Sequence, residues 1–143
     1  MPVDWPFASQ IIELSGVGKR HISCDDGLRQ MATVRDILSD LRGRPGVLLA
    51  DEVGMGKTYV AMAVAASVIV ATRRMHCPVV VMVPRGLRQK WQRDWDQFKT
   101  HCVRDNSLDW ARDKHAHTPT DSFKLPAADV PEPAHLLSIT TGR

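Results

Sequence analysis

The segment Asp51–Thr58 contains the residue types that bind the phosphates of a nucleotide. Glycines at positions 54 and 56 permit backbone conformations in which successive N–H groups point at phosphate oxygens. Lys57 can reach the β- and γ-phosphates, and the hydroxyl of Thr58 can ligate Mg²⁺. The segment therefore predicts a phosphate-binding loop, although an aspartate stands at position 51, where the general pattern has glycine. The predicted nucleotide-binding residues of this loop are Asp51, Glu52, Val53, Gly54, Met55, Gly56, Lys57 and Thr58.

A second segment, Gly16–Lys19, has similar letters in a different context. Arg20 follows it where a hydroxyl residue would be needed, and no apolar helix comes after it. We therefore expect only the segment that ends at Thr58 to bind phosphate.

The elements beside the loop indicate how it would be held. The apolar run Val47–Ala50 predicts a strand buried on both faces in a parallel sheet. After the loop, residues 58–74 are apolar almost all round and predict a buried helix. Val79–Val83 predicts a second buried strand, so these segments form a β-α-β unit with a right-handed crossover.

Two amphipathic helices flank this unit. Asp25 and Asp26 are expected to cap the first helix, whose apolar residues recur with a 3.6-residue period and which ends before Gly43 and Pro45. The second helix is predicted over residues 85–99. One face of it, expected to pack into the core, is formed by Leu87, Trp91, Trp95 and Phe98.

Composition narrows the class of protein. The chain has 143 residues, of which 43% are hydrophobic and 24% charged, which suits a single globular domain. The net charge of +3 is compatible with a polyanionic partner but does not demand one. Three cysteines without a Cys-x-x-Cys pair argue against a disulfide framework or a zinc knuckle, and no signal or membrane-length apolar stretch is present. We therefore expect a cytoplasmic protein.

Two stretches resemble motifs of one known family. Ala50–Thr58 is similar to motif I of the Swi/Snf-type ATPases of helicase superfamily two, a family that tolerates aspartate at the departing position. Val79–Trp91 resembles motif Ia of the same family: an apolar strand, a proline, and a helix with a Gln-x-Trp element. The resemblance covers residues 28–99 and implies an α/β fold, a RecA-like P-loop NTPase domain with a parallel sheet and flanking helices.

The same resemblance implies ligands and further site residues. The family hydrolyses ATP with Mg²⁺, for which Thr58 would be the metal ligand, and moves on DNA. Gln30 would read the adenine edge, whereas its sequence context alone fits a solvent-facing helix residue equally well. Arg85 and Gly86 would contact nucleic acid, with a solvated helix face as the alternative. Residues 139–141 resemble the strand end that carries the next nucleic-acid motif.

Some parts of the family pattern are missing from the sequence. No Asp-Glu-x-His or Asp-Glu-x-Asp motif follows Val83, and no second RecA-like domain is present to supply arginines to the γ-phosphate. We expect an N-terminal segment (1–24, loosely attached), a partial ATP-binding domain (25–99), and a polar linker with a further strand near Leu136 (100–143). The expected function is ATP binding without turnover by this chain alone. The alternatives are a non-catalytic nucleotide- or DNA-binding remnant and a small P-loop kinase or GTPase.

Overall fold

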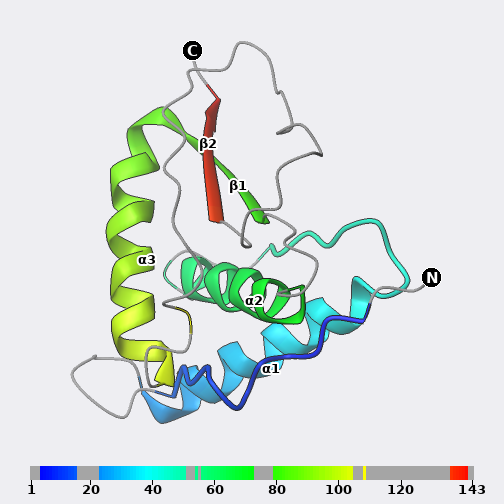
Figure 1. Ribbon diagram of the computed structural model, residues 1–143. Coiled ribbons are helices and arrows are strands. Elements are labelled where there is room, and N and C mark those ends of the chain that lie inside the picture. Colours follow the sequence, from blue (N-terminus) through cyan, green and yellow to red (C-terminus); the bar gives the residue numbers. More distant parts are fainter. Residues whose placement is uncertain are drawn as a thin grey trace.

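The structure, a computed structural model, describes most of the first 104 residues and a short segment near the C-terminus (Figure 1). The described residues are 4–15, 23–50, 54, 56–72, 79–104, 108 and 136–141. In chain order the elements are α1 (Cys24–Asp40), α2 (Lys57–Ala71), β1 (Val79–Pro84), the 3₁₀ turn η1 (Arg85–Leu87), α3 (Arg88–Cys102) and β2 (Leu136–Thr141).

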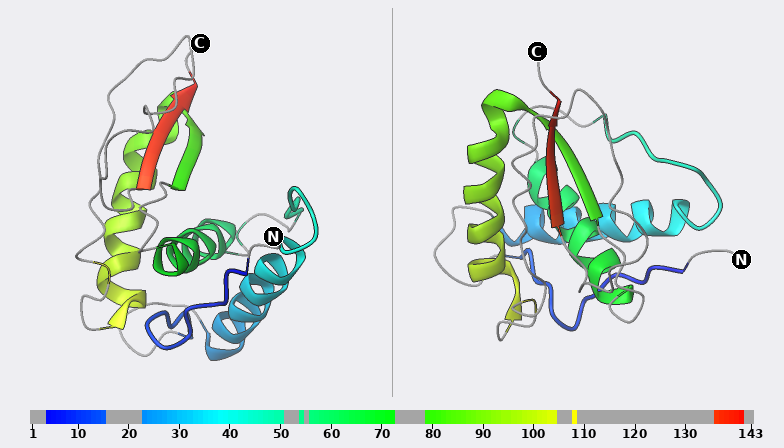
Figure 2. Two further views of the ribbon diagram at one scale, coloured as in Figure 1. Left: turned by 45° about the vertical axis from the view of Figure 1, so that its right-hand side comes forward. Right: turned by 45° about the horizontal axis from the view of Figure 1, so that its top comes forward.

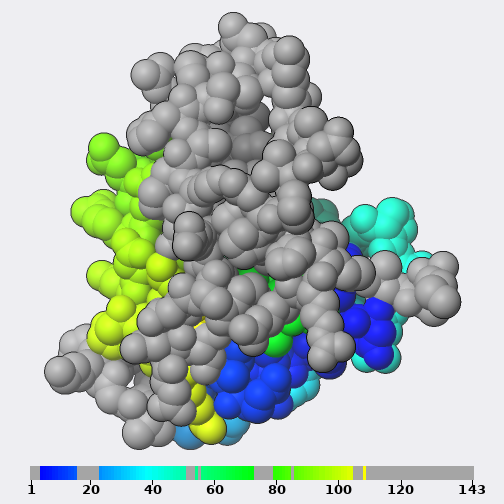
Figure 3. Space-filling view, in the orientation of Figure 1, coloured from blue at the N-terminus to red at the C-terminus, as the bar shows by residue number. Residues whose placement is uncertain are grey.

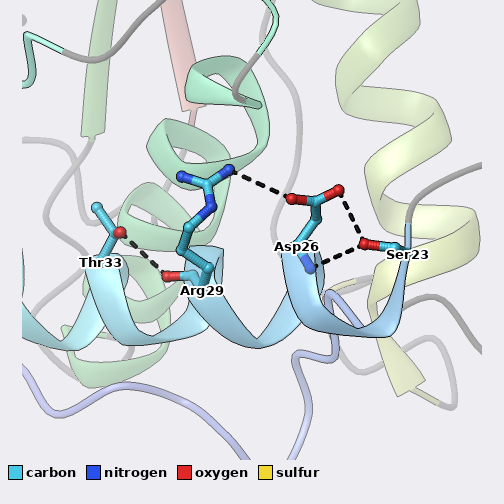
Figure 4. Close-up of polar contacts among 4 residues, drawn as sticks. All are labelled: Ser23, Asp26, Arg29 and Thr33. Carbon is cyan, nitrogen blue, oxygen red and sulfur yellow. Dashed lines mark hydrogen bonds and ion pairs between the residues drawn. The ribbon is translucent and has the colours of Figure 1, made fainter.

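Ser23 caps the N-terminus of α1 (Figure 4). Its Oγ accepts the Asp26 backbone N–H at 3.1 Å and donates to the Asp26 carboxylate at 2.8 Å. Arg29 lies 3.8 Å from the same carboxylate, and Thr33 donates to the Arg29 carbonyl at 3.0 Å. The predicted helix is confirmed, but its predicted cap is wrong. Asp25 and Asp26 lie within the first turn, where negative charge still favours the positive end of the helix dipole.

Helix α2 lies between α1 and α3 and contacts both, as the two views of Figure 2 show. It is apolar almost all round, which explains its central position. The predicted helix over residues 58–74 is confirmed at Lys57–Ala71, and Arg73 and Arg74 lie outside the described residues. No helix in the described part of the chain has the length and apolar character needed to cross a membrane.

Aromatic residues join α3 to α2. Trp95 and Phe98 are buried and stack with ring centroids 5.4 Å apart, and the Tyr59 ring of α2 lies 6.2 Å from that of Phe98. Trp91 is half-buried against the same core, whereas Leu87, at the start of the helix, is 45% exposed. The predicted apolar face of α3 is therefore confirmed from position 91 onward.

The described strands form one parallel pair. Strand β1 pairs with β2 from Val79↔Leu136 to Pro84↔Thr141, and within the described residues no third strand extends this pair. Val47–Ala50, predicted to be a buried strand, has no regular secondary structure. Leu48 is 90% exposed in a loop that projects at the edge of the molecule (Figure 3). An apolar run forms a buried strand only where it can pair with a neighbouring strand and where helices cover the sheet. Among the described residues no strand pairs with Val47–Ala50, and Leu48 stays exposed.

Residues 4–15, here called the strap, lie along α1 in the direction opposite to the helix (Figure 1). Asp4 pairs with Arg42 near the C-terminal end of α1 at 2.6 Å, and the Arg35 guanidinium lies 4.9 Å from the centroid of the Phe7 ring. The buried apolar residues of the strap are Ala8, Ile12 and Leu14. The expected loose attachment of this segment is therefore wrong, because its apolar side chains lie in the main core or pack against it.

The strap is also joined to the C-terminal end of α3 and to the residues just after it. The Glu13 N–H donates to the Cys102 carbonyl and the Arg104 N–H donates to the Ile11 carbonyl, both at 2.8 Å. The Arg104 guanidinium lies 2.6 Å from the Glu13 carboxylate. These contacts hold the strap against the end of α3, so that the strap and the three helices together enclose the core.

Candidate nucleotide-binding site

The phosphate-binding loop meets α2 at Gly56. This residue is the N-cap of α2 and has a left-handed backbone with φ 79° and ψ 22°. Gly54, two residues earlier, also has a positive φ of 87°. Glycine adopts such conformations without the steric cost that other residues incur. No side chain caps α2, so its N-terminus presents backbone donors and a positive dipole end where an anion can bind.

Lys57 and Thr58 are the first two residues of α2, and both are half-buried. No acidic residue lies in the first turn to compete with a bound phosphate. Among the described residues there is no group of three His, Cys, Asp or Glu side chains that could hold a metal ion by themselves. The Thr58 hydroxyl stays the predicted protein ligand for a magnesium ion bound together with phosphate oxygens.

Gln30 of α1 lies directly against this loop. A β-carbon built on Gly56 would fall 2.2 Å from Gln30 Nε2 and 2.7 Å from Gln30 Cδ, so the two residues occupy adjoining space. The Gln30 side chain is 4% exposed, and its Oε1 has no hydrogen-bond partner within the described part of the chain. The solvent-facing alternative for Gln30 is therefore wrong. A buried acceptor without a donor costs about 1–3 kcal/mol, which a ligand that supplies a donor would recover.

The remaining predicted site residues are placed only in part. Asp51, Glu52, Val53 and Met55 lie outside the described residues, as does the second glycine-containing segment, 16–19. The structure thus brings together the second half of the loop and Gln30, from elements separated by about 25 positions in the sequence.

The predicted nucleic-acid contacts lie on a different element. Arg85 and Gly86 form the start of η1, which follows β1 directly. Gly86 is exposed, and a β-carbon there would meet no atom within 4 Å. The Arg85 side chain lies outside the described residues. A macromolecular ligand could therefore approach the turn at Gly86.

The features of this site are typical of one class of protein. A left-handed glycine at the start of a buried helix, with Lys-Thr in its first turn, is typical of a P-loop nucleotide-binding domain, although the strand that usually precedes such a loop is not formed at Val47–Ala50. The chain belongs to the family described as the res subunit of type III restriction enzymes, whose model matches residues 27–128. This is a RecA-like family of helicase superfamily two. No curated protein and no solved structure matches the chain.

The family match extends the resemblance found in the sequence. The resemblance covers residues 28–99, whereas the match runs from residue 27 to residue 128. The part of the predicted polar linker up to residue 128 lies within this match, and its role as a linker stays a prediction.

Proposed function

We propose that this chain binds ATP with Mg²⁺ at the N-terminus of α2. The observation that carries the proposal is the buried, unpartnered Gln30 Oε1 beside Gly56, where the helix N-terminus, Lys57 and Thr58 converge. Membership of a helicase-like family supports a nucleotide ligand over an unrelated anion. The same membership argues against the kinase and GTPase alternatives.

Gln30 would supply the preference for adenine. Its Oε1 is an acceptor, and the adenine 6-amino group is a donor. Guanine has a carbonyl oxygen at that position and would place two acceptors against each other. A site that leaves a buried polar group unpaired discriminates strongly between ligands. We therefore expect ATP to bind more tightly than GTP.

The first test is a titration of the purified chain with Mg·ATP by calorimetry. Lys57→Ala should weaken binding by roughly 10- to 100-fold, because a charge-assisted hydrogen bond to phosphate contributes about 1.5–3 kcal/mol. Lys90→Ala is the matched control, since Lys90 lies on exposed α3 surface paired to Asp94 at 2.5 Å. Equal affinity in Lys57→Ala and the parent chain would refute the site.

The second test concerns the base. Gln30→Ala should reduce the ratio of ATP to GTP affinity toward one, while exposed Gln89→Ala should leave the ratio unchanged. An unchanged ratio in Gln30→Ala would remove Gln30 from the site and leave the phosphate loop in place.

We further propose that the domain is part of an ATP-dependent DNA translocase of the Swi/Snf type. The support is the likeness of Ala50–Thr58 and Val79–Trp91 to motifs I and Ia of that family. In this proposal Arg85 and Gly86 contact the DNA backbone. A nucleotide- or DNA-binding protein without turnover remains the alternative, because the sequence after Val83 contains no acidic motif to activate water.

A further inference from the structure

Gly27 of α1 is buried against the strap. A β-carbon there would lie 2.3 Å from Ser15 Cα and 2.6 Å from the Leu14 carbonyl oxygen, both of which are backbone atoms. Glycine is about 1 kcal/mol less favourable than alanine inside a helix, so helix stability does not explain this residue. The close approach of α1 to the strap does, because any side chain at position 27 would force the two apart.

The strap has little freedom to yield to such a side chain. Near its N-terminal end the Ala8 N–H donates to Ser67 Oγ of α2 at 3.2 Å. Near its C-terminal end Glu13 bonds to the Cys102 carbonyl, at the last residue of α3, and to the guanidinium of Arg104, two residues later. The strap is thus attached to α2 and α3, and pressure at Gly27 would displace α1.

Gln30 would move with that displacement. It lies three positions after Gly27, which places both on the same side of α1. Further along the helix, Met31, Val34 and Leu38 are buried in the core and hold its remaining turns. A push at position 27 would therefore tilt the N-terminal part of α1 and withdraw the Gln30 amide from Gly56.

We propose that the strap is a spacer that sets the distance between α1 and α2, and that Gly27 is a positioning residue acting on the nucleotide through Gln30. This inference rests on the proposed ATP site. It assigns a role in nucleotide recognition to residues 4–15, which precede the part of the chain that the family model matches. Loss of the spacing should impair recognition of the base but not of the phosphates, which bind to α2.

The test is Gly27→Ala, titrated with Mg·ATP and with Mg·tripolyphosphate. The ATP affinity should fall roughly tenfold, as for the loss of one hydrogen bond, and the tripolyphosphate affinity should stay the same. Gly43→Ala is the control, because a β-carbon at Gly43 meets nothing within 4 Å. In a Gln30→Ala background, Gly27→Ala should cause no further loss. Equal loss of both ligands, or an additive loss in the double variant, would overturn the proposal.

A readout without nucleotide separates this inference from the proposed function. In the ligand-free protein, nuclear Overhauser contacts between the Gln30 side-chain amide and the Gly56 α-protons should weaken in Gly27→Ala and persist in Gly43→Ala. Persistence in Gly27→Ala would overturn the inference. Failure of the parent chain to bind ATP would instead refute the proposed function, and these contacts would still decide whether Gly27 positions Gln30.

A second variant loosens the strap if Gly27→Ala does not fold. Ser67→Ala removes the acceptor of the Ala8 N–H and should lower ATP affinity without changing tripolyphosphate affinity. Thr72→Ala is its control, since the Thr72 hydroxyl at the end of α2 donates to the Val68 carbonyl one turn earlier. An unchanged ATP affinity in Ser67→Ala would contradict the spacer role.

Discussion

The amide of Gln30 lies against the backbone of Gly56, close enough that a β-carbon on Gly56 would fall 2.2 Å from Gln30 Nε2. This contact joins α1 to the N-terminus of α2 at the point where the phosphate-binding loop becomes helix. Glycine is therefore needed at position 56 for two reasons: its left-handed backbone and the volume that the glutamine side chain fills.

Gly56→Ala should weaken Mg·ATP binding by at least roughly tenfold. The left-handed conformation costs a non-glycine residue about 1–2 kcal/mol, and the added methyl group would displace the Gln30 amide. Calorimetry measures the effect. Gly54→Ala provides a graded comparison, because position 54 has the same backbone strain but open space around it. Identical losses in the two variants would mean that the Gln30 contact contributes nothing.

The chain should release phosphate from ATP no faster than background, with or without duplex DNA. Its sequence has no acidic motif after Val83 to position magnesium and the attacking water. Positioning and electrostatic stabilisation provide almost all of the catalysis in phosphoryl transfer. A phosphate-release assay decides the matter. DNA-stimulated release that disappears in Lys57→Ala would contradict this prediction.

The local elements could be predicted from the sequence, and the tertiary contacts could not. Helices α1, α2 and α3 follow from apolar periodicity and from the all-round apolar character of residues 57–71. Val47–Ala50 has the composition of a buried strand, yet burial depends on neighbours that a local pattern does not describe. Gln30 could be suspected only through a family resemblance, because its packing against Gly56 joins two separate helices.

If η1 contacts DNA, Arg85→Ala should weaken duplex binding and reduce its salt dependence. Each lost phosphate contact lowers the slope of log affinity against log salt by about 0.9. Fluorescence anisotropy at several salt concentrations measures both quantities. Arg44→Ala is the control, since Arg44 lies after α1 and pairs with Asp40 at 3.9 Å. Parallel salt slopes for Arg85→Ala and the parent would exclude a phosphate contact at Arg85.

Glu13 should make the stability of the strap dependent on acid pH. Hydrogen bonds from Ser15 and then Arg104 hold the pKa of this carboxyl below its usual value. Its stabilising contribution is therefore present above the ordinary glutamate pKa of about 4.3 and is lost as pH falls through the lowered folded-state pKa.

Chemical denaturation of Glu13→Gln can check this contribution. At neutral pH the free energy of unfolding should fall by less than about 1 kcal/mol, because the ion pair is partly exposed. The difference from the parent should shrink in strong acid. A difference that grows as pH falls would reverse the assigned sign.

Phe98 should be a principal determinant of stability. It is fully buried between the Trp95 and Tyr59 rings, so Phe98→Ala should lower the free energy of unfolding by about 3–5 kcal/mol. Leu87→Ala, at a 45% exposed position of the neighbouring turn, should cost below about 1 kcal/mol. Similar midpoints for both variants in thermal unfolding would show that α3 is not packed as described.

The attachment of the strap to the core could not be predicted from the sequence. Its apolar residues show no helical or strand period, so the pattern alone does not indicate how the segment is held. One signal was present: Gly27 interrupts an otherwise regular helix, where glycine is unfavourable. A buried glycine in a helix indicates that another backbone lies close to it, although the sequence does not say which one.

The contacts of the strap can form only after the helices that follow it have been synthesised. Glu13 leaves the ribosome well before its ion-pair partner Arg104, which is 91 positions further along the chain. The hydrogen bond from the Ala8 N–H likewise cannot form until Ser67, 59 positions further along the chain, has been translated. Until α3 has been translated, the nascent chain holds Ile12 and Leu14 without the helices that bury them. A ribosome stalled before α3 would therefore carry an open core, the state on which chaperones act.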